Sequence, residues 1–427
     1  MRTALQQTCA LLLSSLLLAA ALPPRARAAA DADLVFRRFS HLVVQVRIIN
    51  RASGSKSSLG SGFFVHSEGY LITNYHVVSE LVHHPAEYFA ELVMADGSTL
   101  ELRLLNVDVV HDLAILRAPE PVQAPLHLRD QTLPKGTRLF SLGNPHDLGL
   151  AIVEGTYNGP VRHSLYERMH FSGSINPGMS GGPTINGEGE VVGINVSTAG
   201  NAMSFLVPAK YARQLLDDTL AAASNGTEQL LEVTRRQLLA NQDVLINRIL
   251  DTPFASTDLG PYALPGEIAD YFNCWGDDSH DPKTPYKHVR YQCSTDEPIF
   301  VADDVRAGSI DFAHGLVASD ELNRFQFFAL YENFFQWNRS SLDGSEEHVG
   351  TFECQTDFVD HARSTFKVVF CARAYKKLHG LYDMMFKAAS LDDNDLGVYT
   401  DLKLTGVSFE NAKRMARRYL EAIHRRQ

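Results

Sequence analysis

Beyond its first 28 residues the chain has no apolar run long enough to cross a bilayer as a helix, which takes roughly 20 residues. The leader itself is short: Arg2 precedes an apolar stretch over residues 11–21, and Ala26-Arg27-Ala28 is typical of a cleavage site. We therefore predict a secretory signal peptide over residues 1–28, not an uncleaved anchor. The mature protein is expected to be periplasmic or secreted, with no stable membrane span.

Cysteine is also scarce. Cys9 lies in the leader, and the other four lie far beyond it: Cys274, Cys293, Cys354 and Cys371. No pair has Cys-x-x-Cys or Cys/His finger spacing, which leaves a zinc site as the weaker alternative. An even number of cysteines in an exported chain predicts two disulfides. The local pairs Cys274–Cys293 and Cys354–Cys371 are the simplest of the three connectivities.

The chain lacks an excess of positive charge. It has 39 lysines and arginines against 50 acidic residues, a formal net charge of −11. The leader carries three of the arginines and no acidic residue, so its removal makes the mature chain more acidic still. An acidic surface argues against nucleic acid as a partner and favours solubility.

The most informative segment is residues 174–183, which read SINPGMSGGP. A serine hydroxyl needs a neighbouring base to act as a nucleophile, and the tetrahedral intermediate needs N–H groups aimed at its oxyanion. Three glycines, at 178, 181 and 182, let the chain turn sharply and leave the serine unobstructed. Ser180 is therefore the candidate nucleophile, with the backbone N–H groups of Gly178 and Ser180 as the oxyanion hole.

Two upstream segments supply the partners. Residues 69–78, GYLITNYHVV, read as an apolar strand that carries His76. Residues 111–116, HDLAIL, put Asp112 at the start of another apolar strand. In the serine-protease template with this chain order, the histidine is the general base and then the general acid, and the aspartate orients it.

Other residues of the same types lie nearby. Asp108 competes with Asp112 but lacks the apolar strand directly after it. Four further histidines have the ordinary interpretation of surface or core residues: His66, His83, His84 and His111.

Together the three segments resemble the trypsin-like serine proteases of the HtrA/Deg type, whose patterns are TNxHV, DLA and INPGxSGGP. The resemblance runs from about residue 35 to about residue 215, and it implies that His76, Asp112 and Ser180 form a catalytic triad. One position departs: the residue before the nucleophile is usually asparagine in this family and is Met179 here. Because the oxyanion donors are backbone groups, this change need not abolish catalysis. No PDZ domain is recognisable.

The resemblance also implies substrate-binding positions. A substrate strand would pair with the backbone of Asn195, Val196 and Ser197. Ser174 and Ile175 lie where the family places the base of the primary specificity pocket. They carry no carboxylate to offset the desolvation of a basic side chain, so we expect small or medium apolar side chains to be preferred over Lys or Arg. We expect no cofactor and no metal.

Short strands separated by glycine turns, one of them at Asp96-Gly97, predict an all-β double antiparallel barrel, the chymotrypsin-like fold, over residues 31–222. A connecting helix and linker follow over residues 226–259, and a separate, disulfide-bonded α+β domain over residues 260–427. Within it we expect strands at residues 325–330, 365–372, 382–388 and 398–404, and a last helix capped by Ser408.

The leading hypothesis is an exported serine endopeptidase that cuts extended or unfolded segments of protein or peptide substrates. The alternative, from a different class, is a regulatory or binding protein built on an inactive or latent protease scaffold. The sequence leaves the oligomeric state open, a homo-oligomer included.

Overall fold

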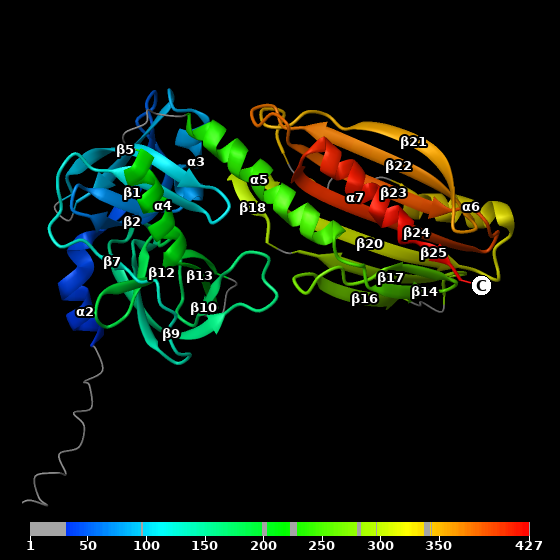
Figure 1. Ribbon diagram of the computed structural model, residues 1–427, viewed down its shortest axis with the longest axis horizontal. Coiled ribbons are helices and arrows are strands. Elements are labelled where there is room, and N and C mark those ends of the chain that lie inside the picture. The colour runs from blue at the N-terminus through cyan, green and yellow to red at the C-terminus, as the bar shows by residue number, and fades with distance from the viewer. Residues whose placement is uncertain are drawn as a thin grey trace, which may run out of the picture.

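The computed structural model describes residues 31–94, 97–198, 203–222, 229–279, 283–295, 297–336, 342 and 344–426. The predicted signal peptide and Asp96 of the expected hairpin turn lie outside these residues. Figure 1 shows two halves, one formed by residues 31–222 and one built around a large sheet, with the long helix α5 (Leu230–Leu250) running from one to the other. Within the described ranges, no helix combines the length and apolarity that a membrane crossing requires.

The first half contains two antiparallel barrels, which confirms the predicted fold class. The first closes in the order β1-β2-β3-β6-β5-β4. Its strands are β1 (Val43–Asn50), β2 (Lys56–His66), β3 (Tyr70–Thr73), β4 (Tyr88–Val93), β5 (Thr99–Asp108) and β6 (Leu113–Arg117). The period-2 alternation of a strand is visible in β1, where Val44, Val46 and Ile48 all join one core cluster.

The second barrel runs β11-β8-β9-β10-β13-β12 and is closed by the pairing of β11 with β12. Its strands are β8 (Arg138–Gly143), β9 (Ala151–Pro160), β10 (Met169–Phe171), β11 (Pro183–Ile185), β12 (Glu190–Thr198) and β13 (Ser204–Pro208), with the short β7 (His127–Leu128) added in parallel to β12. Helices α2 (Ala32–Phe39) and α4 (Ala209–Ala222) flank the barrels.

The predicted strand through residue 78 is wrong beyond its first half. Strand β3 ends at Thr73, and helix α3 (Tyr75–His83) follows at once, so His76 lies in the first turn of a helix. Tyr75, Val78 and Val82 share one core cluster, and their spacing of three and four residues is that of a helix face. Because the apolar run is short, its sequence does not reveal the change from the two-residue period of a strand to the 3.6-residue period of a helix.

The C-terminal half is built on a seven-stranded antiparallel sheet in the order β16-β17-β20-β24-β23-β22-β21. The strands are β16 (Asn273–Ser279), β17 (Lys287–Ser294), β20 (Ile310–Ala318), β21 (Glu353–His361), β22 (Ser364–Ala374), β23 (Tyr382–Ser390) and β24 (Leu396–Val407). Helix α7 (Phe409–Glu421) packs on one face together with the end of α5, and its N-cap is Ser408, as predicted. Helix α6 (Arg324–Phe335) packs through Phe327 and Tyr331 on the opposite face.

Helix α6 replaces the strand predicted at residues 325–330, and that prediction is wrong. Asn323 caps the helix through a capping box with Gln326, a signal that the apolar composition of the run obscured. The buried residues Phe327 and Tyr331 are four apart, whereas Phe325 is 86% exposed. The period is therefore helical, although the composition is that of a strand.

Two small sheets complete this half. A three-stranded sheet joins β14 (Ser256–Leu259), β15 (Tyr262–Pro265) and β25 (His424–Arg425), and it begins inside the segment assigned above to the linker. The hairpin of β18 (Ile299–Ala302) and β19 (Val305–Ala307) leaves the main sheet and packs on α3 of the first barrel. Ile299, Val301 and Val305 belong to the same core cluster as Val78, so the two halves share one hydrophobic core.

Both predicted disulfides are confirmed. Cys274 pairs with Cys293 across β16 and β17, and Cys354 pairs with Cys371 across β21 and β22. Strands β16 and β21 are the two edges of the seven-stranded sheet. Each disulfide therefore fastens an outermost strand to its neighbour, where a strand has pairing on one side only.

Reduction is expected to destabilise the C-terminal half first. The bridges close loops with sequence separations of 19 and 17 residues. A disulfide that closes a loop of this size stabilises the folded protein by roughly 3 kcal/mol. Thermal unfolding with and without reductant, combined with hydrogen exchange of β16 and β21, measures the effect. A variant with all four cysteines replaced by alanine is the control and should not respond to reductant. Free thiols at all four positions in the untreated mature protein would contradict the assignment.

Candidate active site

His76 and Asp112 meet at one rim of the first barrel. Strands β3 and β6 are antiparallel neighbours with Thr73 opposite Ala114, so the residue after β3 and the residue before β6 come together. Asp112 Oδ2 lies 2.7 Å from His76 Nδ1, and Asp112 Oδ1 accepts the backbone N–H of His76 at 2.8 Å. The carboxylate thus holds both the ring and the start of helix α3.

Asn74 positions this aspartate, a role that sequence reasoning missed. Asp112 has a φ of 60°, a left-handed conformation that asparagine and aspartate adopt more readily than most residues. The fully buried Asn74 donates its side-chain N–H to the Asp112 carbonyl at 2.7 Å. Asn74 stands two residues before the histidine in the motif, and that place was the available signal.

The predicted nucleophile lies on a loop that packs against the same rim. Ser61 N donates to Ser180 O at 2.7 Å. A side chain on Gly181 would meet Ser61 O and Thr73 Oγ1 at 2.3 Å and Asn74 N at 2.9 Å, which explains the glycine. The Ser180 hydroxyl donates to Val196 O at 3.3 Å, and no hydrogen bond joins it to His76 in the described part of the chain.

The loop before Ser180 is a type II turn. Met179 N donates to Asn176 O at 3.0 Å, Pro177 takes the second position, and Gly178 takes the third with a φ of 93°. Pro177 O accepts from His146 N at 2.9 Å, so the Gly178 N–H of this trans peptide points the opposite way. Among the described residues, the N–H groups of Gly178 and Ser180 have no acceptor, and both are available to an oxyanion.

Two buried residues brace this loop. Met179 has no exposed surface and packs in the core of the second barrel with Leu139 and Phe171, so an apolar anchor stands where the family has asparagine. Asn195 is also fully buried, and its side chain donates to Met179 O at 3.1 Å and to Leu142 O at 3.2 Å. The loop is therefore held by packing on one side and by an amide on the other.

The five residues proposed to bind substrate fall in different places. Ser174 is exposed, Ile175 lies in the second-barrel core, and Val196 is half-buried beside the Ser180 hydroxyl. Asn195 lies in the interior, where its side chain has no access to a substrate in this structure. Ser197 belongs to β12, and its side chain lies outside what is described.

The competing residues are engaged elsewhere. Asp108 accepts from His111, through the backbone N–H at 3.1 Å and ring Nδ1 at 2.6 Å, and the His111 ring stacks on Tyr211. Burial lowers the pKa of His83 to about 4, and the neutral ring donates to Val301 O at 3.0 Å. The sequence favoured Asp112 over Asp108 only by the apolar strand that follows it. In the structure their partners distinguish them, because Asp112 contacts His76 and Asp108 contacts His111.

A cavity of about 360 Å³ opens beside the His76–Asp112 pair. Its walls come from both barrels and also from residues 297–300 of the C-terminal half. The Phe300 ring lies 5.8 Å from the His76 ring, centroid to centroid. Nothing in the sequence pattern pointed to Phe300, because more than 200 residues separate it from the histidine.

The environment of His76 sets the pH at which it can act as a base. Burial lowers its pKa, but the charge and hydrogen bond of Asp112 outweigh this effect, so the pKa is raised above its ordinary value of about 6.5. The side chains of His76 and Asp112 are only 28% and 10% exposed, which keeps the pair partly screened from solvent.

Peptidase activity is therefore expected to rise with pH along a limb centred above about 6.5, because only the neutral imidazole can take a proton. Below the raised pKa the ring is protonated and activity is lost. The pH dependence of kcat/KM, which reports the free enzyme, measures this. A limb centred below the ordinary histidine value would contradict the assigned environment.

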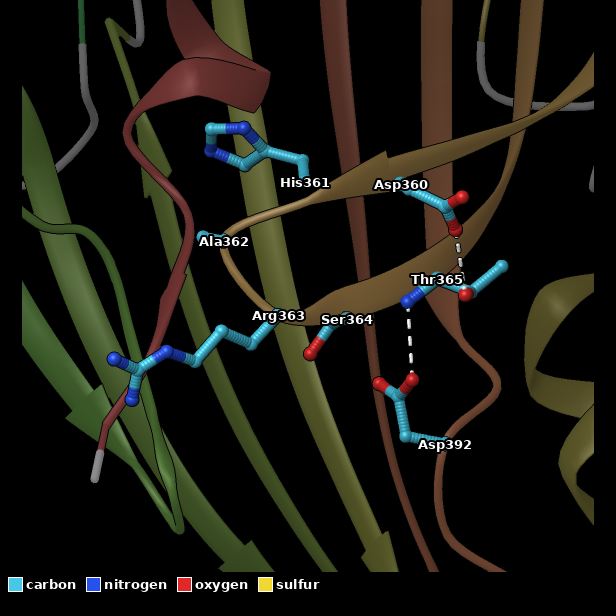
Figure 2. Close-up of a pocket in the computed structure, with 7 residues that line it drawn as sticks. All are labelled: Asp360, His361, Ala362, Arg363, Ser364, Thr365 and Asp392. Atoms are coloured by element: carbon cyan, nitrogen blue, oxygen red, sulfur yellow. Dashed lines mark hydrogen bonds between the residues drawn. The ribbon is translucent and has the colours of Figure 1, made fainter.

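A second hollow lies at the turn between β21 and β22 (Figure 2). Thr365 joins its two sides, through Oγ1 to Asp360 at 2.7 Å and through its N–H to Asp392 at 3.0 Å. The residues that line it include no nucleophile paired with a base. Elsewhere in the described ranges, no group of three or more His, Cys, Asp or Glu residues is placed to hold a metal ion.

Comparisons with known proteins concern the first half of the chain. Residues 60–194 match the family of the trypsin-like peptidase domain. Over 172 residues the chain is 33% identical to the "Probable periplasmic serine endoprotease DegP-like" of Rhizobium meliloti (strain 1021), covering 38% of this chain and 33% of that protein. Over 177 residues it is 29% identical to "Serine protease HTRA1" of Xenopus tropicalis, covering 39% and 37%.

The crystal structure of the serine endoprotease from Yersinia pestis aligns at 26% identity with a TM-score of 0.39, covering 47% of this chain and 69% of that chain. The chain spans about a third of the length of the curated relatives that it matches.

Proposed function

We propose, since the first half of the chain is a trypsin-like protease domain of the HtrA type, that the protein is an exported serine endopeptidase. The observation that carries the proposal is the pair formed by His76 Nδ1 and Asp112 Oδ2, 2.7 Å apart beside the Ser180 loop. Its substrates are extended or unfolded protein segments, and it acts outside the cytoplasm, in the periplasm or secreted.

In the proposed reaction His76 Nε2 takes the Ser180 proton as Oγ attacks the scissile carbonyl. The Asp112 carboxylate keeps the proton of the imidazole on Nδ1 and stabilises the imidazolium that forms. The N–H groups of Gly178 and Ser180 stabilise the oxyanion. The imidazolium then protonates the leaving amine. In the second half of the reaction His76 takes a proton from water, which attacks the acyl-enzyme, and the imidazolium then returns a proton to Ser180 Oγ. The Ser180 hydroxyl, which donates to Val196 O at 3.3 Å in this structure, must turn toward His76 for the first step.

The primary pocket is proposed to prefer small or medium apolar side chains. Ser174 and Ile175 at its expected base carry no charge, and a basic side chain would be desolvated there without a carboxylate. A substrate backbone would pair with β12 near Val196, whose carbonyl already lies beside the nucleophile.

A fluorophosphonate probe tests the proposal directly, because it labels only a serine activated by its base. The mature protein is expected to be labelled once, at Ser180, and Ser180→Ala should not be labelled. A folded mature protein that is neither labelled nor able to cleave an unfolded protein would instead support the binding or latent scaffold.

A further inference from the structure

We propose that the C-terminal half completes the substrate-binding cleft, with Phe300 forming the wall of a pocket for an apolar substrate side chain. The inference rests on the proposed function and extends it: specificity would depend on a residue outside the protease domain. The substrate class is an extended peptide with a large apolar or aromatic residue on the acyl side of the scissile bond, at a position before the one that fills the primary pocket.

The pocket is continuous with the catalytic pair. His76 and Asp112 line the 360 Å³ cavity together with Val196, Phe205 and residues 297–300. Its size is at the lower end of the range for pockets that bind small ligands, and it suits one large side chain. Because the cavity is open space, residues 297–300 bound it and do not fill it.

The wall is held rigidly. Ile299 is buried in the core shared by the two halves. Val301 O accepts hydrogen bonds from Tyr75 OH at 3.2 Å and from the His83 ring at 3.0 Å, and both donors belong to the helix that carries His76. Ser164 Oγ donates to the Glu297 carboxylate at 2.7 Å. The wall and the general base are thus parts of one packed unit.

Phe300 itself is fixed from behind. The Arg306 guanidinium lies over its ring, 4.3 Å from the centroid, and Tyr375 OH donates to Arg306 O at 3.1 Å. Arg306 is opposite Phe300 in the β18–β19 hairpin. A ring that contacts both Arg306 and His76 is pre-organised, so a bound side chain meets a defined surface without ordering it first.

The lining sets the chemistry of the ligand. Most of the lining is apolar or aromatic, including Tyr166, Val109 and Phe205. The two charged side chains apart from the catalytic pair are Arg168 and Glu297, and Glu297 is already bonded to Ser164. Burial of an apolar side chain here gains free energy in proportion to the area removed from water.

The position of Val196 orients the substrate. Its carbonyl accepts a hydrogen bond from the Ser180 hydroxyl. The neighbouring residue Ser197 of β12 pairs with Phe205 of β13. A peptide that pairs with β12 from Val196 onward would therefore run along the cavity that Val196 and Phe205 line, with the residues on the acyl side of the scissile bond.

The test compares Phe300→Ala and Phe300→Trp with the full mature chain. Phe358→Ala, which removes a 63% exposed phenylalanine from β21, is the matched control. A library of quenched peptides varied at the positions before the scissile bond gives kcat/KM for Phe, Leu and Ala at each position. Fluorophosphonate labelling rate and thermal midpoint confirm that each variant is folded and has an activated serine.

We expect the wild type and Phe358→Ala to prefer Phe or Leu over Ala about tenfold or more at one of these positions. Phe300→Ala should lose about tenfold of this preference, and Phe300→Trp, which narrows the pocket, should shift the preference toward smaller residues. Phe358→Ala should be labelled within about twofold of the wild-type rate, because it changes an exposed residue of the edge strand β21. Both Phe300 variants should still be labelled at Ser180.

Unchanged profiles in both labelled, folded Phe300 variants would overturn the inference and leave the proposed function standing. A uniform rise in kcat/KM for every peptide would also overturn it, because Phe300 would then be a barrier to substrates in general. A wild type that is not labelled and cleaves no peptide would overturn the proposed function itself, and the inference with it.

Discussion

Replacing Ser180 with alanine is expected to lower kcat by a factor on the order of 10⁶, because the hydroxyl is the atom that would form the acyl-enzyme. The loop should keep its shape, since it is held by Met179 in the core and by backbone bonds to Ser61 and Asn195. Turnover of an unfolded protein substrate measures the loss, and the thermal midpoint should be unchanged.

His76→Ala is the companion to this variant. The two residues act as a unit, so the double variant with Ser180→Ala should be about as inactive as either single variant. Turnover that persists in Ser180→Ala, after contamination by a host protease has been ruled out, would contradict the assignment of the nucleophile.

Asp112→Asn is expected to lower kcat by about 10⁴, the second-largest effect, through the tautomer of His76. Asp112 Oδ1 accepts the backbone N–H of His76, so that position must remain an oxygen in the asparagine. The new amide NH₂ then faces His76 Nδ1, which must act as the acceptor. The ring proton moves to Nε2, and the nitrogen needed as the base is no longer free.

Asp108→Asn is the matched control for this variant. Asp108 binds His111 through the same two contacts, a backbone N–H and ring Nδ1. We expect this variant to retain activity within about twofold, because Asp108 contacts His111 and neither side chain lines the cavity beside His76. Equal losses in the two variants would show that the effect comes from folding and not from the tautomer.

Much of the candidate site was predictable because its chemistry is local. The turn before Ser180 favours proline and then requires a positive φ, which glycine adopts, and only glycine fits at 181 against Thr73. Such requirements act over a few residues, so they leave a readable motif. The two disulfides were predictable for a similar reason: each joins neighbouring strands of one hairpin.

Two strand predictions were wrong, those through residue 78 and at residues 325–330. In both, the residue composition favours a strand, whereas the spacing of the buried residues is that of a helix. Tyr75 to Val82 and Arg324 to Phe335 are apolar runs, and such runs suit a buried strand or a buried helix equally well. The choice depends on which partner each face meets, the barrel core for Val78 and the sheet for Phe327, and that partner is distant in sequence.

By itself, then, the sequence determined the fold class of the first half, the identities of His76, Asp112 and Ser180 as candidates, and the expectation of two disulfides, with the local pairs as the simplest of three connectivities. Only the tertiary structure decided that Asn74 holds Asp112, that Asn195 and Met179 brace the loop before Ser180, and that the Phe300 ring lies beside His76. The physical reason is the sequence separation of the residues that contact one another. A turn or a hairpin is specified by its own residues, whereas a packed wall is specified by shape complementarity between segments that no local pattern connects.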